Sequence, residues 1–121
     1  MLPYYKQYNL EWNRQKRKKL FQQSSHFSIY HEGAFSGILV YTQQSTELFI
    51  LELEIVPDKQ SLGLGTQALV YLDGIAKQAM FESISLNVFK SNPAYQFYLK
   101  NNFELVTEKS VVYFLRRALS F

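Results

Sequence analysis

The chain has 121 residues, of which 47% are hydrophobic and 19% charged, and its formal net charge is +3. One globular domain usually takes roughly 100 to 150 residues, so this length excludes two large domains, and the composition excludes a disordered chain. The sequence contains no cysteine, which excludes disulfides, thiolate metal sites and thiol catalysis. We therefore predict a single domain over residues 1–121. Because the first 20 residues have neither the apolar stretch of a signal peptide nor a membrane span, we expect a cytoplasmic protein.

Positive charge is concentrated at the beginning of the chain, where the first 25 residues hold six basic groups and one acid. Aromatic and apolar residues recur there at helical spacing after Pro3, which predicts an amphipathic helix over Tyr4–Gln23. The basic run at 14–19 is typical of a solvated helix face. Its alternative role is binding nucleic acid, which we rank last because most aromatic residues fall at core positions, not in an exposed stacking array.

Three β-strands are predicted next. Two β-rich runs, His26–His31 and Ala34–Thr42, flank Glu32-Gly33, and the glycine supplies the positive φ of a tight turn, so these runs form a hairpin. Polar residues 43–46 predict a second turn. Glu47–Val56 is the third strand, in which leucine and isoleucine alternate with two glutamates and which a proline ends.

The second half of the chain alternates helices and strands. Apolar residues at helical spacing predict a helix over Leu64–Phe81, followed by a strand over Ser83–Phe89. A short helix over Asn92–Asn101 has a capping asparagine and a proline in its first turn, and Phe103–Glu108 with Val111–Arg117 predicts a final hairpin. A strand, helix, strand order implies a parallel crossover, so the fold class is α/β or α+β with a mixed sheet.

A glycine-rich turn, Gln60–Thr66, lies between the third strand and the long helix. Glycines at a helix N-terminus leave backbone N–H groups open to an anion, and the helix dipole favours negative charge there. The segment lacks the Gly-Lys-Ser/Thr of a P-loop, and Ala68 replaces the third glycine of the dinucleotide fingerprint. Taken alone, the two glycines, Gly63 and Gly65, are equally typical of a plain strand-to-helix turn.

Two segments in order make the pattern specific. Ile55–Thr66 contains Gln-x-x-Gly-x-Gly, and Ser85–Phe103 contains Asn-Pro-Ala followed by a tyrosine. Together they resemble the GNAT superfamily of N-acetyltransferases, whose Q/R-x-x-G-x-G/A signature binds the pyrophosphate of acetyl-CoA and whose N-P-A-x-x-x-Y segment forms a helix beside the thioester. The resemblance covers about residues 33–115. It implies a GNAT-like fold that begins after the family's usual first strand and helix, and acetyl-CoA as cosubstrate.

The resemblance also implies roles for individual residues. Backbone amides of the glycine-rich turn would hold the pyrophosphate, two residues at the end of the third strand would pair with the pantetheine arm, and an asparagine would face that arm. Tyr98 takes the family's general-acid position and would protonate the leaving thiolate; its alternative is a core aromatic on an amphipathic helix. The cofactor-binding residues are then Ile55, Val56, Gln60, Leu62, Gly63, Leu64, Gly65, Thr66 and Asn92.

A base must deprotonate the acceptor ammonium, because a protonated amine has no lone pair with which to attack. Glu54 is the first candidate. By strand alternation it shares a face with Glu52, and it lies closer to the point where the two parallel strands would separate. The alternative is a solvated strand face, which the pattern favours more for Glu52 than for Glu54.

Departures from the family pattern define the open alternatives. Ser61 and Leu62 replace the Gly and basic residue common in the pyrophosphate loop, whereas Asn102, in place of a glycine, tolerates a left-handed helix end. The shortened start and a bare sheet edge are compatible with a homodimer. We predict transfer of acetyl to a primary amine of a small molecule or peptide, the alternative being a non-catalytic acyl-CoA-binding or regulatory module. His26 and His31 are isolated, so no metal site is predicted.

Overall fold

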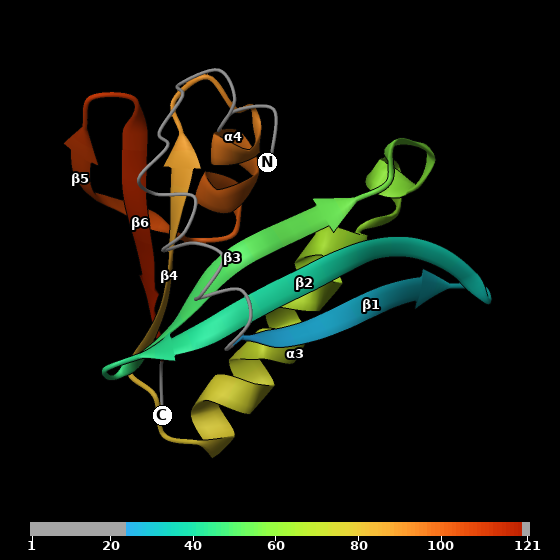
Figure 1. Cartoon of the computed structure of the whole chain (residues 1–121), viewed down its shortest axis with the longest axis horizontal. Coiled ribbons are helices and arrows are strands. Elements are labelled where there is room, and N and C mark those ends of the chain that lie inside the picture. Colours follow the sequence, from blue (N-terminus) through green and yellow to red (C-terminus); the bar gives the residue numbers. More distant parts are fainter. Residues whose placement is uncertain (1–23, 120–121) are drawn as a thin grey trace.

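The computed structural model describes residues 24–119, which form one mixed sheet with helices (Figure 1). The predicted helix over Tyr4–Gln23 and the basic run at 14–19 lie outside the described residues. Within these, the strand order is β1-β2-β3-β4-β6-β5. The strands are β1 (Ser25–His31), β2 (Ala34–Gln44), β3 (Glu47–Ile55), β4 (Ser83–Phe89), β5 (Glu104–Lys109) and β6 (Val112–Ala118).

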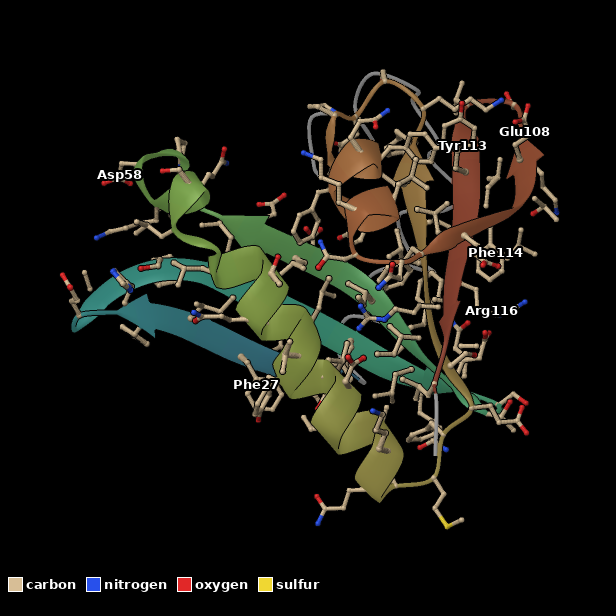
Figure 2. All side chains as sticks on the ribbon, turned by 180° about the vertical axis from the view of Figure 1, so that it is seen from behind. Phe27, Asp58, Glu108, Tyr113, Phe114 and Arg116 are labelled. Carbon is tan, nitrogen blue, oxygen red and sulfur yellow. The ribbon has the colours of Figure 1, made fainter. Side chains whose placement is uncertain are left out.

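Only the neighbours β3 and β4 run parallel among the strand pairs of the described chain. The helix between them, α3 (Leu64–Gln78), lies across the face formed by β1 to β3, as Figure 2 shows from behind. This crossover and the mixed sheet confirm the predicted fold class. The core packs one face of the sheet against α3 and the second helix, α4 (Ala94–Lys100). Its buried members are Leu39, Tyr41, Leu48, Ile50, Leu69, Leu72, Ala76, Ile84, Leu86, Val88, Tyr98, Phe103 and Leu115.

The turns carry the residues that tolerate a left-handed backbone. Glu32 and Gly33 have φ of 53° and 81°, as a tight hairpin turn of the mirror-image type requires. Asn102 has φ of 70°, which confirms the prediction that asparagine adopts a left-handed conformation after α4. The second hairpin turn is shorter than predicted. Residues 43 and 44 extend β2, and only Ser45, with φ of 55°, and its neighbour turn the chain.

Most strand ends differ from the sequence prediction by one or two residues, and the helical segments differ more clearly. Pro57 ends β3 as expected, but Pro57–Leu62 then forms a 3₁₀ helix, η1, that the sequence pattern did not indicate. The long helix ends at Gln78 and not at residue 81, because Met80 has φ of 63°. The short helix begins at Ala94, whose N–H donates to the Asn92 side chain at 2.9 Å, so the predicted cap is present.

A partly buried polar network joins the ends of three strands. The carboxylate of Glu47, on β3, accepts hydrogen bonds from the Ser83 hydroxyl of β4 at 2.7 Å and from the Arg116 guanidinium of β6. Figure 2 labels Arg116 on β6. The hydrogen bond from Arg116 is the main reason that the pKa of Glu47 lies below its ordinary value, and burial opposes it. One carboxylate therefore ties the parallel pair to the C-terminal hairpin.

We predict that Glu47→Gln destabilises the protein by about 1 kcal/mol at pH 7, since it removes the charge from a hydrogen-bonded ion pair with Arg116 that is partly exposed to solvent. A carboxyl whose pKa is lowered by folding contributes stability above its unfolded pKa of about 4.3, and loses it as the pH falls through the folded value. The difference between the two proteins in urea unfolding should therefore shrink below about pH 4. An equal difference at pH 7 and pH 3 would contradict this role.

Candidate active site

The parallel pairing of β3 and β4 stops well before either strand ends. Ile50 faces Leu86 in the last pair, although β3 continues to Ile55 and β4 to Phe89. At the next residue, Leu51, the register of β3 with β2 shifts, so that β3 holds one residue more than β2. Such a bulge bends its strand, and Figure 1 shows the two strands diverging toward their ends.

A pocket of about 380 Å³ lies between the diverging strands. Its walls come from β3 beyond the bulge, the end of β4, the beginning of η1 and the start of α4. Of the predicted site residues, the structure brings five to this pocket: Glu54, Ile55, Gln60, Asn92 and Tyr98. The others, Val56 and residues 62–66, do not line it and belong to the adjoining segment that leads into α3.

The backbone groups at the end of β3 point alternately toward β2 and toward β4. The N–H of Val56 donates to Ser36 of β2 at 2.8 Å, and its carbonyl accepts from Lys59 at 2.9 Å, so both groups are engaged away from the pocket. Backbone groups alternate in direction along a strand, so those of Ile55 and Leu53 point toward β4, where the ladder has ended. The backbone of Leu53 and Ile55, and not that of Val56, therefore faces the open side of β3, where the Ile55 carbonyl also accepts a hydrogen bond from the Gln60 side chain. Leu53 was not among the residues predicted from the sequence.

The glycine-rich turn begins α3 without a capping side chain. Gly63 is the N-cap residue, with φ of 76°, and an added Cβ would meet nothing within 4 Å there. The first hydrogen bond of the helix runs from Gln67 to Gly63, so the preceding N–H groups have no acceptor of their own within the helix. The Gln60 side chain donates to the Ile55 carbonyl at 3.0 Å and closes the segment between strand and helix.

Gly65 has a different environment from Gly63. A Cβ at Gly65 would lie 3.0 Å from Cζ of Phe97, a residue of α4. A side chain at Gly65 would therefore crowd the Phe97 ring, which would have to shift to accept it. The sequence carries no local signal for this contact, because the two residues are brought together only by the tertiary fold.

Tyr98 is buried, with 6% of its surface exposed, and its ring packs edge-on against Phe97 and Phe103 at centroid distances of 5.2 and 5.4 Å. Burial raises the pKa of Tyr98 strongly, and the negative charges of Glu52 and Glu54 raise it further. The phenol therefore remains protonated at neutral pH. It is a core aromatic and a pocket-lining hydroxyl at once, so the two sequence-based alternatives do not exclude each other.

The two glutamates of β3 differ in exposure. Glu52 is 8% exposed and Glu54 is exposed, and both line the pocket. The expectation that Glu52 belongs to a solvated strand face is wrong. The bulge explains this result, because it interrupts the simple alternation from which the expectation was drawn and leaves Ile50, Leu51 and Glu52 buried in succession.

The helix that carries Tyr98 is anchored at both ends. At its start, the side chain and the carbonyl of Asn92 accept hydrogen bonds from Ala94 and Tyr95, at 2.9 and 3.1 Å. At its end, Arg117 of β6 donates to the carbonyl of Asn101 at 2.8 Å and pairs with Asp73 of α3. Arg117 therefore links the end of the helix that carries Tyr98 to both β6 and α3.

Residues 24–119 include no group of three or more His, Cys, Asp or Glu residues that could hold a metal ion. Nor is any helix of that part of the chain long and apolar enough to cross a membrane.

Comparison with known families identifies the class of protein that this fold and pocket define. The family model described as the acetyltransferase (GNAT) family matches residues 1–103. The chain therefore belongs to the GNAT family of acetyltransferases. The comparison with curated proteins found no match.

Solved structures of several acetyltransferases share the fold. The PaiA N-acetyltransferase from Thermoplasma acidophilum, in complex with coenzyme A, is 16% identical with a TM-score of 0.74, over 87% of this chain and 65% of that one. A ribosomal-protein alanine N-acetyltransferase from Escherichia coli is 17% identical with a TM-score of 0.72, over 89% and 77%. A nourseothricin acetyltransferase is 17% identical with a TM-score of 0.75, over 81% and 66%. This chain thus spans slightly less than two thirds of the first of these proteins.

Proposed function

We propose that the protein is an acetyl-CoA-dependent N-acetyltransferase that transfers acetyl directly to a primary amine of a small molecule or peptide. The observation that carries this proposal is the pocket between the diverging strands, where a buried phenol and two carboxylates meet beside an uncapped, glycine-rich helix start. Membership of an acetyltransferase family and a fold shared with a coenzyme A complex support the choice of donor.

The donor's two halves match two adjoining parts of the chain. N–H groups at the start of α3, within Leu62–Thr66, would hold the pyrophosphate, since a helix N-terminus favours an anion. Gly63 leaves open space beside that backbone. The backbone of Leu53 and Ile55, which points to the side where pairing with β4 has ended, would pair with the amide groups of the pantetheine arm. Asn92 lines the same pocket.

The reaction needs one base and one acid. Glu54 would remove a proton from the acceptor ammonium, directly or through water, and the freed nitrogen lone pair would attack the acetyl carbonyl. A C–N bond forms, the C–S bond breaks, and the sulfur takes the proton of the Tyr98 hydroxyl. The nitrogen then gives up its second proton, which returns Tyr98 to the neutral phenol, and Glu54 releases the first proton to solvent. A thiolate left unprotonated in a partly dry pocket is costly, so a nearby neutral donor lowers the barrier. The raised pKa of Tyr98 keeps that proton in place until the sulfur becomes basic.

Acetyltransferases that share this fold differ in their acceptors. Two relatives of equal identity to this chain, 17% each, act on a protein alanine and on nourseothricin according to their descriptions. Similarity at this level supports the fold and not the acceptor. We therefore keep the acceptor as a primary amine and leave the choice between small molecule and peptide to a substrate screen.

We predict that acetyl-CoA binds the wild-type protein in a calorimetric titration and that Gly63→Trp abolishes the binding. The indole would occupy the open space beside the first N–H groups of α3. Gly63→Ala carries the same backbone strain without the bulk, and Val70→Trp adds an indole at an exposed position of the same helix, so both should still bind. Failure of the wild type to bind would refute the proposal.

We predict that Tyr98→Phe lowers kcat by about 10²- to 10⁴-fold, the usual contribution of a general acid, while acetyl-CoA affinity stays unchanged. The ring and its packing are retained in this variant, so the loss reports the hydroxyl. In the wild type, the raised pKa places any loss of activity through this phenol above pH 10. Undiminished turnover in Tyr98→Phe would remove the tyrosine from the mechanism, and binding without transfer to any amine would favour the non-catalytic alternative.

We predict that Glu54→Gln lowers kcat at pH 7 by about 10²-fold or more and that the deficit shrinks as the pH approaches the pKa of the acceptor amine. At high pH the amine reaches the pocket already neutral, so a base is no longer needed. The matched variant is Glu52→Gln, which changes the second carboxylate of the same strand. If Glu52→Gln shows the pH-dependent deficit and Glu54→Gln does not, the base assignment moves to Glu52.

A further inference from the structure

Phe97 joins the two halves of the candidate active site. The tip of its ring points at the start of α3, where an added Cβ on Gly65 would lie 3.0 Å from Cζ and 3.3 Å from Cε1. Its ring also packs edge-on against the adjacent tyrosine, Tyr98, at 5.2 Å between centroids and an interplanar angle of 67°. Phe97 is half-buried, so one ring touches both the glycine-rich turn and the side chain proposed as acid.

The packing of Phe97 favours glycine over alanine at position 65. The signature that the sequence resembles accepts either glycine or alanine at this position. Here an alanine would sit closer to the Phe97 ring than ordinary van der Waals contact allows, so either the ring or the start of α3 would have to move. The Phe97 ring occupies the space that the methyl group of an alanine would need.

The ring of Tyr98 contacts two aromatic neighbours. Phe103 packs edge-on against it at 5.4 Å and 71°, and Phe97 does so at 5.2 Å and 67°. Edge-to-face pairs of this kind prefer a narrow range of orientations. Since a displacement of about 1 Å at a reacting group can cost about 10²-fold in rate, the orientation of the phenol matters as much as its presence.

We propose that Phe97 is a positioning residue, which fixes the orientation of the Tyr98 hydroxyl relative to the pyrophosphate turn by packing against Gly65. The inference rests on the proposed acetyl transfer with Tyr98 as acid. Phe97 itself donates no proton and contacts no reacting atom. Its effect on the rate passes through Tyr98, and its contact with Gly65 links that effect to the segment that holds the donor.

The first test is a double-mutant cycle of Phe97→Leu with Tyr98→Phe, measured as kcat under saturating acetyl-CoA. Leucine keeps an apolar side chain but removes both ring contacts. Phe97→Leu alone should lower kcat by about tenfold to a hundredfold with little change in the KM for acetyl-CoA. In the Tyr98→Phe background it should have no further effect, because no hydroxyl remains to be positioned.

A merely structural role predicts a different result. Loss of packing would lower kcat by the same factor in both backgrounds, and that outcome would overturn the inference while leaving the proposed function intact. Leu99→Ala, a change at a partly exposed position of the same helix, is the matched control and should act equally in both backgrounds. If Tyr98→Phe loses no activity, the proposed acid is wrong and the positioning role falls with it.

The second test needs no acceptor. Gly65→Ala should weaken acetyl-CoA binding in calorimetry, since the methyl group pushes the start of α3 away from Phe97, and Phe97→Leu in the same chain should restore the binding. Gly74→Ala adds a methyl group to the same helix where nothing lies within 4 Å, and should leave binding unchanged. Equal weakening by Gly65→Ala with and without Phe97 would show that the contact does not link the two segments, and would overturn the inference.

Discussion

The structure depends on one extra residue in β3. The bulge at Leu51 stands at the point where the parallel ladder of β3 and β4 ends, and everything proposed for the site lies beyond it. A regular strand would continue to pair with β4, and its backbone groups would be consumed within the sheet. Because β3 bends away, Leu53 and Ile55 keep backbone groups directed to a pocket that the sheet itself creates. A β2 backbone packed closely at Gly37, where a Cβ would overlap the carbonyl of Glu54, holds the bent segment in place.

Burial and charge give Tyr98 and the two glutamates of the pocket different properties. Two carboxylates face a phenol that is almost fully buried, and the same charges that make the pocket suitable for a cationic amine also oppose ionisation of Tyr98. An acid is useful only if it keeps its proton until the leaving group needs it, and a base is useful only if it is ionised beforehand. Burial and the two carboxylates keep the Tyr98 phenol protonated, and Glu54 lies exposed at the same pocket.

The sequence was sufficient for the elements and insufficient for their contacts. Alternation and helical spacing predicted each strand and both α-helices of the described part, but not the 3₁₀ helix η1, and the left-handed positions at Gly33 and Asn102 followed from residue chemistry. The burial of Glu52 did not follow, because a bulge leaves no local signature and reverses the expectation drawn from alternation. The contact between Gly65 and Phe97 was missed for the same physical reason: it depends on how α3 and α4 pack, which no spacing within either segment encodes.

The turn before α3 also constrains how a pyrophosphate would be bound. Residues 60–66 contain no Lys or Arg, so the expected basic residue of the family is absent and the attraction rests on directed N–H groups and the helix dipole. Backbone donors act only at the correct distance and angle, whereas a flexible cation attracts an anion from many positions. The affinity of such a turn therefore depends on the position of the helix start. The packing of Phe97 against Gly65 therefore matters for donor binding. The ring that we propose to orient Tyr98 also contacts the start of α3, which must present those N–H groups.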